Sequence, residues 1–193
     1  MSYTNPTDTE ISSIGLDAAI TILQAQLKAL TWLNKVFHRA YTHREVNKLG
    51  KTIIIPKVWE AQNEWYDCRP NDAVISQAFF TPLSEERVTS FEKFADPTFE
   101  QDIALIVWVN VDQLPGHISG PSLGYQKAEV ISILKTSDSV MDIAEIIDIS
   151  AVEIYKGFTI ADENTHYTML PFAGFRVNLT VKFDYINCVV ASS

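Results

Sequence analysis

GFRVNLTVKFDYINC, residues 174–188, alternates apolar and polar side chains more regularly than the rest of the chain. Apolar or aromatic residues fill every second position from Phe175 to Tyr185, and polar residues fill the positions between them. This two-residue period is typical of a β-strand with one buried face. Eleven positions at about 3.3 Å each span about 36 Å, whereas most strands span about 17–20 Å. The pattern therefore predicts an unusually long C-terminal strand.

The composition is that of a globular domain. The chain has 193 residues, of which 47% are hydrophobic and 20% charged, a balance typical of one folded domain. Apolar runs such as 103–109 are far shorter than a membrane-spanning helix, and we expect no signal peptide. Two cysteines, Cys68 and Cys188, are too few for a disulfide framework. They indicate buried thiols in a reducing compartment, with a bridge between them as the alternative.

The order of helical and strand patterns predicts an α+β fold. A helical period covers 14–31, with Ser12 or Ser13 as its N-cap, and a second helix follows the Gly/Pro-rich stretch near 115–124. We expect this second helix to resume over 140–147, with its acidic residues on a solvated face. The predicted strands are 35–41, 52–55, 73–80, 101–111, 151–155 and the long last one.

The strand 101–111 is apolar on both sides and is expected at the centre of the sheet. Pro56 limits its strand to an edge or a strand end. The stretches 42–52 and 81–98 are charged and are expected to be connections. Residues 1–13 are predicted to be a flexible N-terminal segment, and 14–193 a single α+β domain. Its sheet is expected to be mixed and mainly antiparallel, with two helices packed on one face.

Charge is divided between two parts of the chain, whose net charge is −9. Residues 34–57 hold six basic residues and one acid, whereas 96–153 hold ten acids and two lysines. Two solvated faces of opposite sign would explain this, as would two patches that meet between identical subunits, or a basic patch facing DNA. The interface candidates are Arg39, Arg44, Lys48 and Lys51 on the basic side, Asp138, Asp142, Glu145 and Asp148 on the acidic side, and Arg176 and Lys182 on the polar side of the last strand.

Motifs for catalysis are absent from the sequence. It has no phosphate-binding glycine loop, no nucleophile elbow and no zinc-protease motif. Asp162, Glu163, Asn164 and His166 form a local group whose spacing fits no standard metal site. Cys68 has Arg69 beside it but no nearby histidine. We therefore expect no catalytic residue, no cofactor and no metal.

Several short stretches carry a family resemblance. They are LTWLNKVF at 30–37, PKVW at 56–59, EWY at 64–66, PND at 70–72, AFF at 78–80 and ALIVWVN at 104–110. Their order resembles small virion proteins of tailed bacteriophages, of the tail-terminator, tail-completion and neck-ring type, most closely those of crAss-like phages. The stretches 81–98 and 113–124 depart from the common pattern, which leaves the position of the ring open.

The resemblance implies a structural role in the virion. It implies an α+β subunit, made in the bacterial cytoplasm, that forms a six- or twelve-fold ring around DNA beside portal, neck or tail ring proteins. It implies no catalytic residue and no membrane. A tail-tube protein is the first alternative, and a small cytoplasmic enzyme or ligand-binding domain is the alternative of another class. In a ring, the far half of the long strand is expected to pair or pack with a neighbour.

Overall fold

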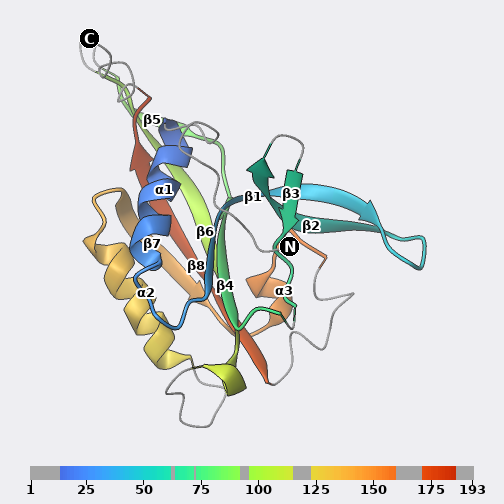
Figure 1. The fold of residues 1–193 in the computed structure, drawn as a ribbon. Coiled ribbons are helices and arrows are strands. Elements are labelled where there is room, and N and C mark those ends of the chain that lie inside the picture. Colours follow the sequence, from blue (N-terminus) through green and yellow to red (C-terminus); the bar gives the residue numbers. More distant parts are fainter. Residues whose placement is uncertain are drawn as a thin grey trace.

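The computed structural model describes residues 14–61, 64–71, 73–91, 96–114, 123–159 and 171–185. The elements are α1 Gly15–Leu27, β1 Lys35–Val46, β2 Thr52–Ala61, β3 Glu64–Asp67, β4 Ser76–Pro82, β5 Arg87–Ser90, β6 Thr98–Asn110, a 3-10 turn Val111–Gln113, α2 Gly124–Thr136, β7 Val140–Ile147, α3 Ala151–Ile154 and β8 Phe172–Phe183 (Figure 1). The predicted N-terminal segment 1–13, the loop 115–122, the group 162–166 and Cys188 lie outside the described residues.

The sheet is mixed and mainly antiparallel, as predicted. Its strand order is β3-β2-β1-β4-β6-β8-β7, and β5 pairs with β6 outside this path. Among the described strands only β1 and β4 pair in parallel. Helices and a largely antiparallel sheet confirm the α+β class.

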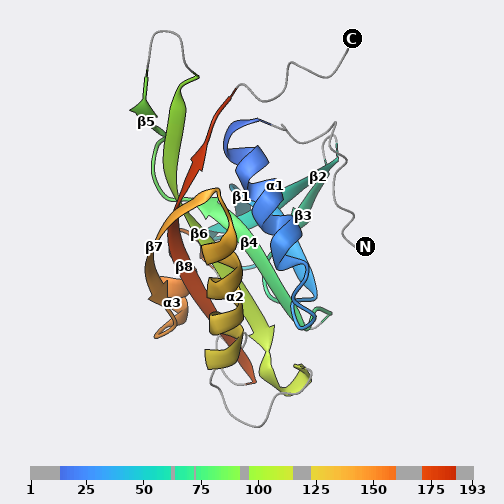
Figure 2. The same ribbon diagram turned by 90° about the vertical axis from the view of Figure 1, so that its left-hand side faces the viewer.

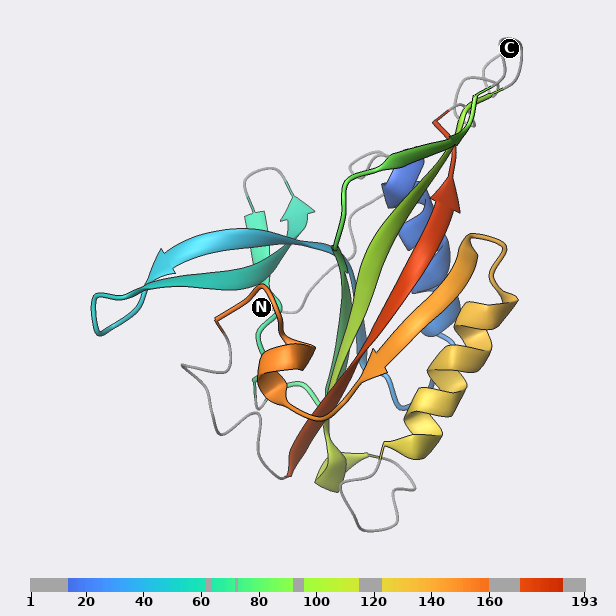
Figure 3. The same ribbon diagram turned by 180° about the vertical axis from the view of Figure 1, so that it is seen from behind.

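Helices α1 and α2 pack side by side on one face of the sheet, as predicted (Figure 2). Helix α1 ends at Leu27, and its N-cap is Ile14 in place of the predicted Ser12 or Ser13. On part of the opposite face α3 packs against the sheet (Figure 3), and side chains of β2 and β3 join the same cluster. Trp108 lies there, 1% exposed and stacked on Phe172 with ring centroids 5.2 Å apart. Strand β6 is therefore central and buried on both faces.

The long C-terminal strand is paired inside its own chain. Strand β8 has twelve residues, Phe172–Phe183, and each is opposite a residue of β6 between Phe99 and Asn110. On its other side β7 pairs with the stretch from Arg176 to Val181. The expectation that half of this strand is left for a neighbour is therefore wrong, because β6 is as long as β8.

Residues 140–147 form the strand β7, so the helix predicted there is wrong. Strand β7 pairs antiparallel with β8, but two bulges interrupt the ladder. Each bulge adds one residue to β7 that β8 does not match. As a result Asp142 and Glu145, three residues apart, lie opposite Thr180 and Asn178, which are two residues apart. Because of the bulges, acidic side chains on one face of β7 are three residues apart in the sequence, a spacing that resembles one face of a helix.

Three other predicted segments differ from the structure. The predicted strand 151–155 is instead the short helix α3, Ala151–Ile154, which is capped by Ser150. The predicted loop 81–98 contains β5, which forms a hairpin with β6. The predicted connection 42–52 is largely strand, because β1 continues to Val46 and pairs with β2.

Strand β2 passes through Pro56, which neither ends the strand nor marks an edge. Pro56 is opposite Thr42 of β1, but its carbonyl accepts a hydrogen bond from the Cys68 N–H at 3.0 Å, on the other side. The nitrogen and the carbonyl of one strand residue point to the same side. The nitrogen of Pro56 therefore faces away from β1, and the β1–β2 ladder needs no hydrogen-bond donor at this position.

Candidate subunit interface

The β1–β2 hairpin extends away from the rest of the molecule and carries most of the predicted basic surface (Figure 1, Figure 3). Strand β1 pairs with β4 only as far as Arg39, and beyond that residue it pairs, among the described strands, with β2 alone. We term residues 40–56 the basic arm. Its Arg44, Lys48 and Lys51 are exposed, and none of them forms an ion pair with a described residue.

Arg39 does not belong to this free basic surface. Its guanidinium lies 3.2 Å from the carboxylate of Asp17 in α1. It also donates hydrogen bonds to the hydroxyl of Tyr41 and lies over that ring. The predicted interface residue Arg39 is therefore a contact between α1 and β1 within one chain.

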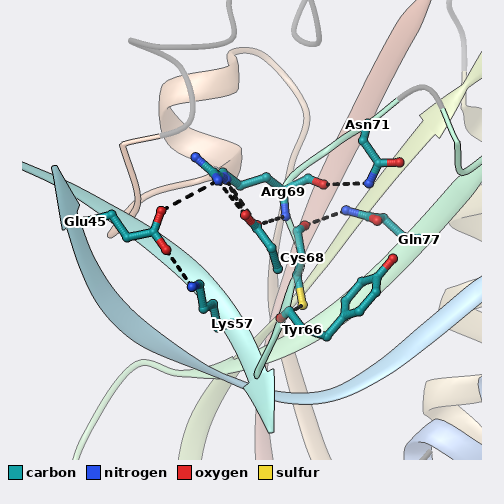
Figure 4. A network of polar contacts seen from close by, with 8 residues as sticks. Glu45, Lys57, Tyr66, Cys68, Arg69, Asn71 and Gln77 are labelled. Atoms are coloured by element: carbon teal, nitrogen blue, oxygen red, sulfur yellow. Dashed lines mark hydrogen bonds and ion pairs between the residues drawn. The ribbon is translucent and has the colours of Figure 1, made fainter. Parts of the chain in front are cut away.

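Ion pairs link Glu45 of the basic arm to Lys57 of β2 and to Arg69, which follows β3 (Figure 4). Glu45 accepts a hydrogen bond from Lys57 Nζ at 2.5 Å, and its other oxygen lies 3.8 Å from the Arg69 guanidinium. The Lys57 hydrogen bond lowers the pKa of the Glu45 carboxyl. Arg69 pairs in turn with Asp67. Because these charges offset one another, the basic charge of the arm that stays free is that of Arg44, Lys48 and Lys51.

Strand β7 is the last strand of the sheet order, at the end away from β3, β2 and β1. It carries the acidic candidates. We term residues 138–148 the acidic edge. Asp142 and Glu145 are both exposed, and Glu145 accepts a hydrogen bond from the Asn178 amide at 3.1 Å. The two bulges place both carboxylates on one face of β7, which the sequence predicted by a wrong route.

The two outer members of the acidic edge differ from each other. Asp138 is exposed in the turn before β7 and forms no ion pair with a described residue. Asp148 follows β7 and forms an ion pair with Lys127 of α2. Asp138, Asp142 and Glu145 form no ion pair with a described residue, although the charge of Glu145 interacts with that of Arg176.

The structure separates the two interface candidates of β8. Arg176 is 4% exposed and donates to Asn178 Oδ1 at 2.7 Å and to the Lys156 carbonyl at 3.3 Å. Burial lowers the pKa of its guanidinium. Arg176 therefore ties β8 to the turn after α3 and is not a surface contact, which corrects the prediction. Lys182 is exposed opposite Glu100 of β6.

Sequence reasoning missed a buried polar cluster between α1 and β1. His38, 5% exposed, follows Val36 by two residues and shares its side of the strand, which the alternation could have indicated. Its Nε2 lies 3.1 Å from the main-chain carbonyl of Asp17 and 3.2 Å from Thr21 Oγ1. Its Nδ1 lies 4.0 Å from the Asp17 carboxylate. Burial lowers the pKa of His38 to about 4 and raises the pKa of Asp17.

Hydroxyl, imidazole and carboxylate in this order resemble a nucleophilic triad, but the hydrogen bonds oppose that role. A carbonyl oxygen only accepts, so we assign the proton to Nε2 of His38, which then cannot take one from Thr21. Thr21 Oγ1 itself donates to the Asp17 carbonyl at 2.8 Å. The cluster thus holds α1 on β1 and has no base aimed at the hydroxyl.

Other sites for chemistry are weak within the described residues. No group of three or more His, Cys, Asp or Glu side chains there could hold a metal ion. Cys68 is a buried free thiol, and burial raises its pKa well above the usual value. An open hollow of about 910 Å³ beside the arm is lined by residues of both signs, including Glu45, Lys51 and Arg69. None of the described helices is both long and apolar enough to cross a membrane.

Comparison with protein-family models, with curated proteins and with solved structures found no match. Function is therefore inferred from the surfaces of this chain. The two that stand out are the basic arm and the acidic edge, which belong to different strands and carry free charge of opposite sign.

Proposed function

We propose that the protein is a structural virion protein that forms a closed ring at the head–tail junction of a tailed bacteriophage, around the DNA channel. The observation that supports this most is the free charge of opposite sign on two different edges of one subunit. In a closed ring, one surface of each subunit contacts a different surface of the next. Opposite charges on these surfaces favour that contact and disfavour contact between two identical surfaces.

The family resemblance extends the proposal to the ring's neighbours. The ring has six or twelve copies and stacks on portal, neck or tail ring proteins. DNA passes through its lumen without sequence-specific binding. The function needs no catalytic residue, cofactor or metal, and purified protein is expected to hold no stoichiometric metal ion.

The mass of the purified protein in solution, combined with negative-stain images, tests the ring. The expected result is a single species whose mass is a multiple of 21.7 kDa, seen as rings with a central hole. Protein that stays monomeric at every concentration contradicts the proposal.

Charge reversal tests which surfaces meet. Arg44→Glu with Lys48→Glu should weaken assembly, and Asp142→Lys with Glu145→Lys in the same chain should restore it. Lys135→Glu with Lys156→Glu is the matched control, because it makes the same charge change at exposed positions outside both surfaces. If the arm reversal leaves rings intact but particles lose DNA, the arm faces DNA and the subunits meet elsewhere.

A further inference from the structure

The two surfaces of the proposed ring are also open edges of the sheet. Among the described strands β7 pairs with β8 alone, and the β1 part of the basic arm pairs with β2 alone. An open strand edge presents main-chain N–H and C=O groups that a further strand can bond. Subunits that meet there can therefore join through their main chains as well as through side-chain charge.

The hydrogen bonds of β2 show which groups of the arm face outward. The Ile54 N–H donates to Thr159 Oγ1 at 2.7 Å, and the Ile54 carbonyl accepts from the Thr159 N–H at 2.8 Å. Ile54 and Pro56 thus point their main-chain groups away from β1. Their partners on β1 are Arg44 and Thr42. In an antiparallel ladder such pairs face apart, so Arg44 and Thr42 direct their N–H and C=O groups to the open edge.

We infer that the β1 edge of the basic arm adds as a strand to the β7 edge of a second copy, so that the sheets of neighbouring subunits join. This rests on the proposed function and describes how its interface is made. The open part of β1 covers 40–46, and β7 covers 140–147, so the two edges match in length. Pairing them brings Arg44 near Asp142 and Glu145.

Charge and shape favour this pairing over the other strand additions. Two acidic edges, or two basic arms, would bring like charges together across the new ladder, which is unfavourable. Acidic side chains on β7 disfavour the addition of a second β7, but they attract a basic strand. Exposed apolar side chains lie on both edges, Met141 and Ile146 on β7 and Val46 on the arm. Joining the edges removes them from water.

Thr42→Pro tests the main-chain bonds of the added strand. This change removes one outward N–H, and Pro56 opposite shows that the ladder accepts proline at an outward position. The isolated variant subunit should therefore melt as the parent does. The Kd of assembly should rise about tenfold, as expected when one or two hydrogen bonds across the interface are lost. Thr42→Val is the control, since it keeps the N–H and should assemble normally.

Disulfide trapping tests the heterologous register. Cysteine is placed at Thr42 or Arg44 and, in the same chain, at Asp142 or Glu145, with Cys188→Ser as the background. Paired strands bring Cα atoms to about 4.5–5.5 Å, which is within disulfide range. At least one pair should give a covalent ladder longer than a dimer on mild oxidation, whereas each single cysteine variant should stop at a dimer.

Three results overturn the inference. If Thr42→Pro assembles with the parent's Kd and no cysteine pair forms a ladder, the subunits do not join by strand addition, although the ring itself can stand. If isolated Thr42→Pro melts well below Thr42→Val, the chain uses this edge itself. If the parent never assembles, the proposed function fails and the inference fails with it.

Discussion

At the scale of single residues, His38 couples the stability of the fold to pH. Its ring lies between α1 and β1, where a charged imidazole would lose its hydration. Burial is the main cause that lowers its pKa from 6.5 to about 4, and the nearby charges of Arg39 and Lys28 act in the same direction. The hydrogen bond to the Asp17 carbonyl opposes this shift but does not outweigh it. The folded chain therefore holds His38 neutral.

The free energy of unfolding should fall as pH falls from about 6.5 toward 4. In this window the unfolded chain binds a proton at His38 that the folded chain does not bind, so acid favours unfolding. The shift from 6.5 to about 4 corresponds to roughly 3 kcal/mol at most. Asp17 acts in the opposite sense, because its raised pKa favours proton uptake by the folded chain.

His38→Gln should flatten this acid dependence, since glutamine can donate to the Asp17 carbonyl and does not titrate. Denaturant unfolding at pH 7 and pH 4.5 measures the effect. His43→Gln is the control, because His43 lies on the more exposed arm, and this variant should keep most of the parent's slope. An unchanged slope in His38→Gln would show that another group causes the acid loss.

At the scale of elements, prediction from sequence succeeded where a strand is regular and buried. The alternation in β8 and the apolar run in β6 predicted both strands. Each residue of β8 is opposite one residue of β6, so no bulge interrupts the two-residue period. The apolar stripe of α1 likewise predicted that helix. These elements bury a continuous face, and such a face leaves a periodic pattern in the sequence.

Prediction failed where a local feature changes the period or where little is buried. The bulges give β7 a helix-like spacing of three residues. Helix α3 spans only Ala151–Ile154 and buries too few side chains to show a helical period. The outer part of β1, residues 42–46, is only exposed or half-buried in a two-stranded arm, and its sequence THREV does not alternate apolar and polar residues.

The sequence predicted which segments of the candidate interface are basic and which are acidic. It did not predict which of their side chains bind other residues of the same chain. Charge counts located the basic arm and the acidic edge. They did not show that Arg39 is held by Asp17, that Arg176 is buried against the Lys156 carbonyl, or that Asp148 pairs with Lys127. These partners are distant in sequence, and only the folded chain brings them together.

Trp108→Ala tests the central position of β6. Trp108 is 1% exposed and packs on Phe172, so the change leaves a large cavity in the sheet core. The free energy of unfolding should fall by about 3–5 kcal/mol, as for other large-to-small changes in cores. Trp65→Ala is the control, since Trp65 is 40% exposed and should cost much less. Equal melting temperatures for the two variants would contradict the burial of β6.

At the scale of the whole molecule, the charge of the subunit and the charge of its edges act in opposite directions on assembly. Copies with a net charge of −9 repel one another, whereas the basic arm and the acidic edge attract. The repelling charges are spread over the surface, and those farther apart than the Debye length of about 10 Å are screened at 0.1 M salt. Charges that meet across the interface are closer and are screened less. Local attraction should therefore dominate near physiological salt.

Assembly of the parent protein should weaken as NaCl rises from 0.1 M to 0.5 M. A few exposed pairs, each contributing up to ~1 kcal/mol, account for a rise in Kd of about tenfold. The Kd should then level off, because main-chain and apolar contacts are not screened. Arg44→Glu with Lys48→Glu should remove or reverse this dependence, and Lys135→Glu with Lys156→Glu should keep it. Analytical ultracentrifugation measures the Kd of assembly at each salt concentration. If the Kd of the parent falls steadily as salt rises, the edge charges do not select the partner.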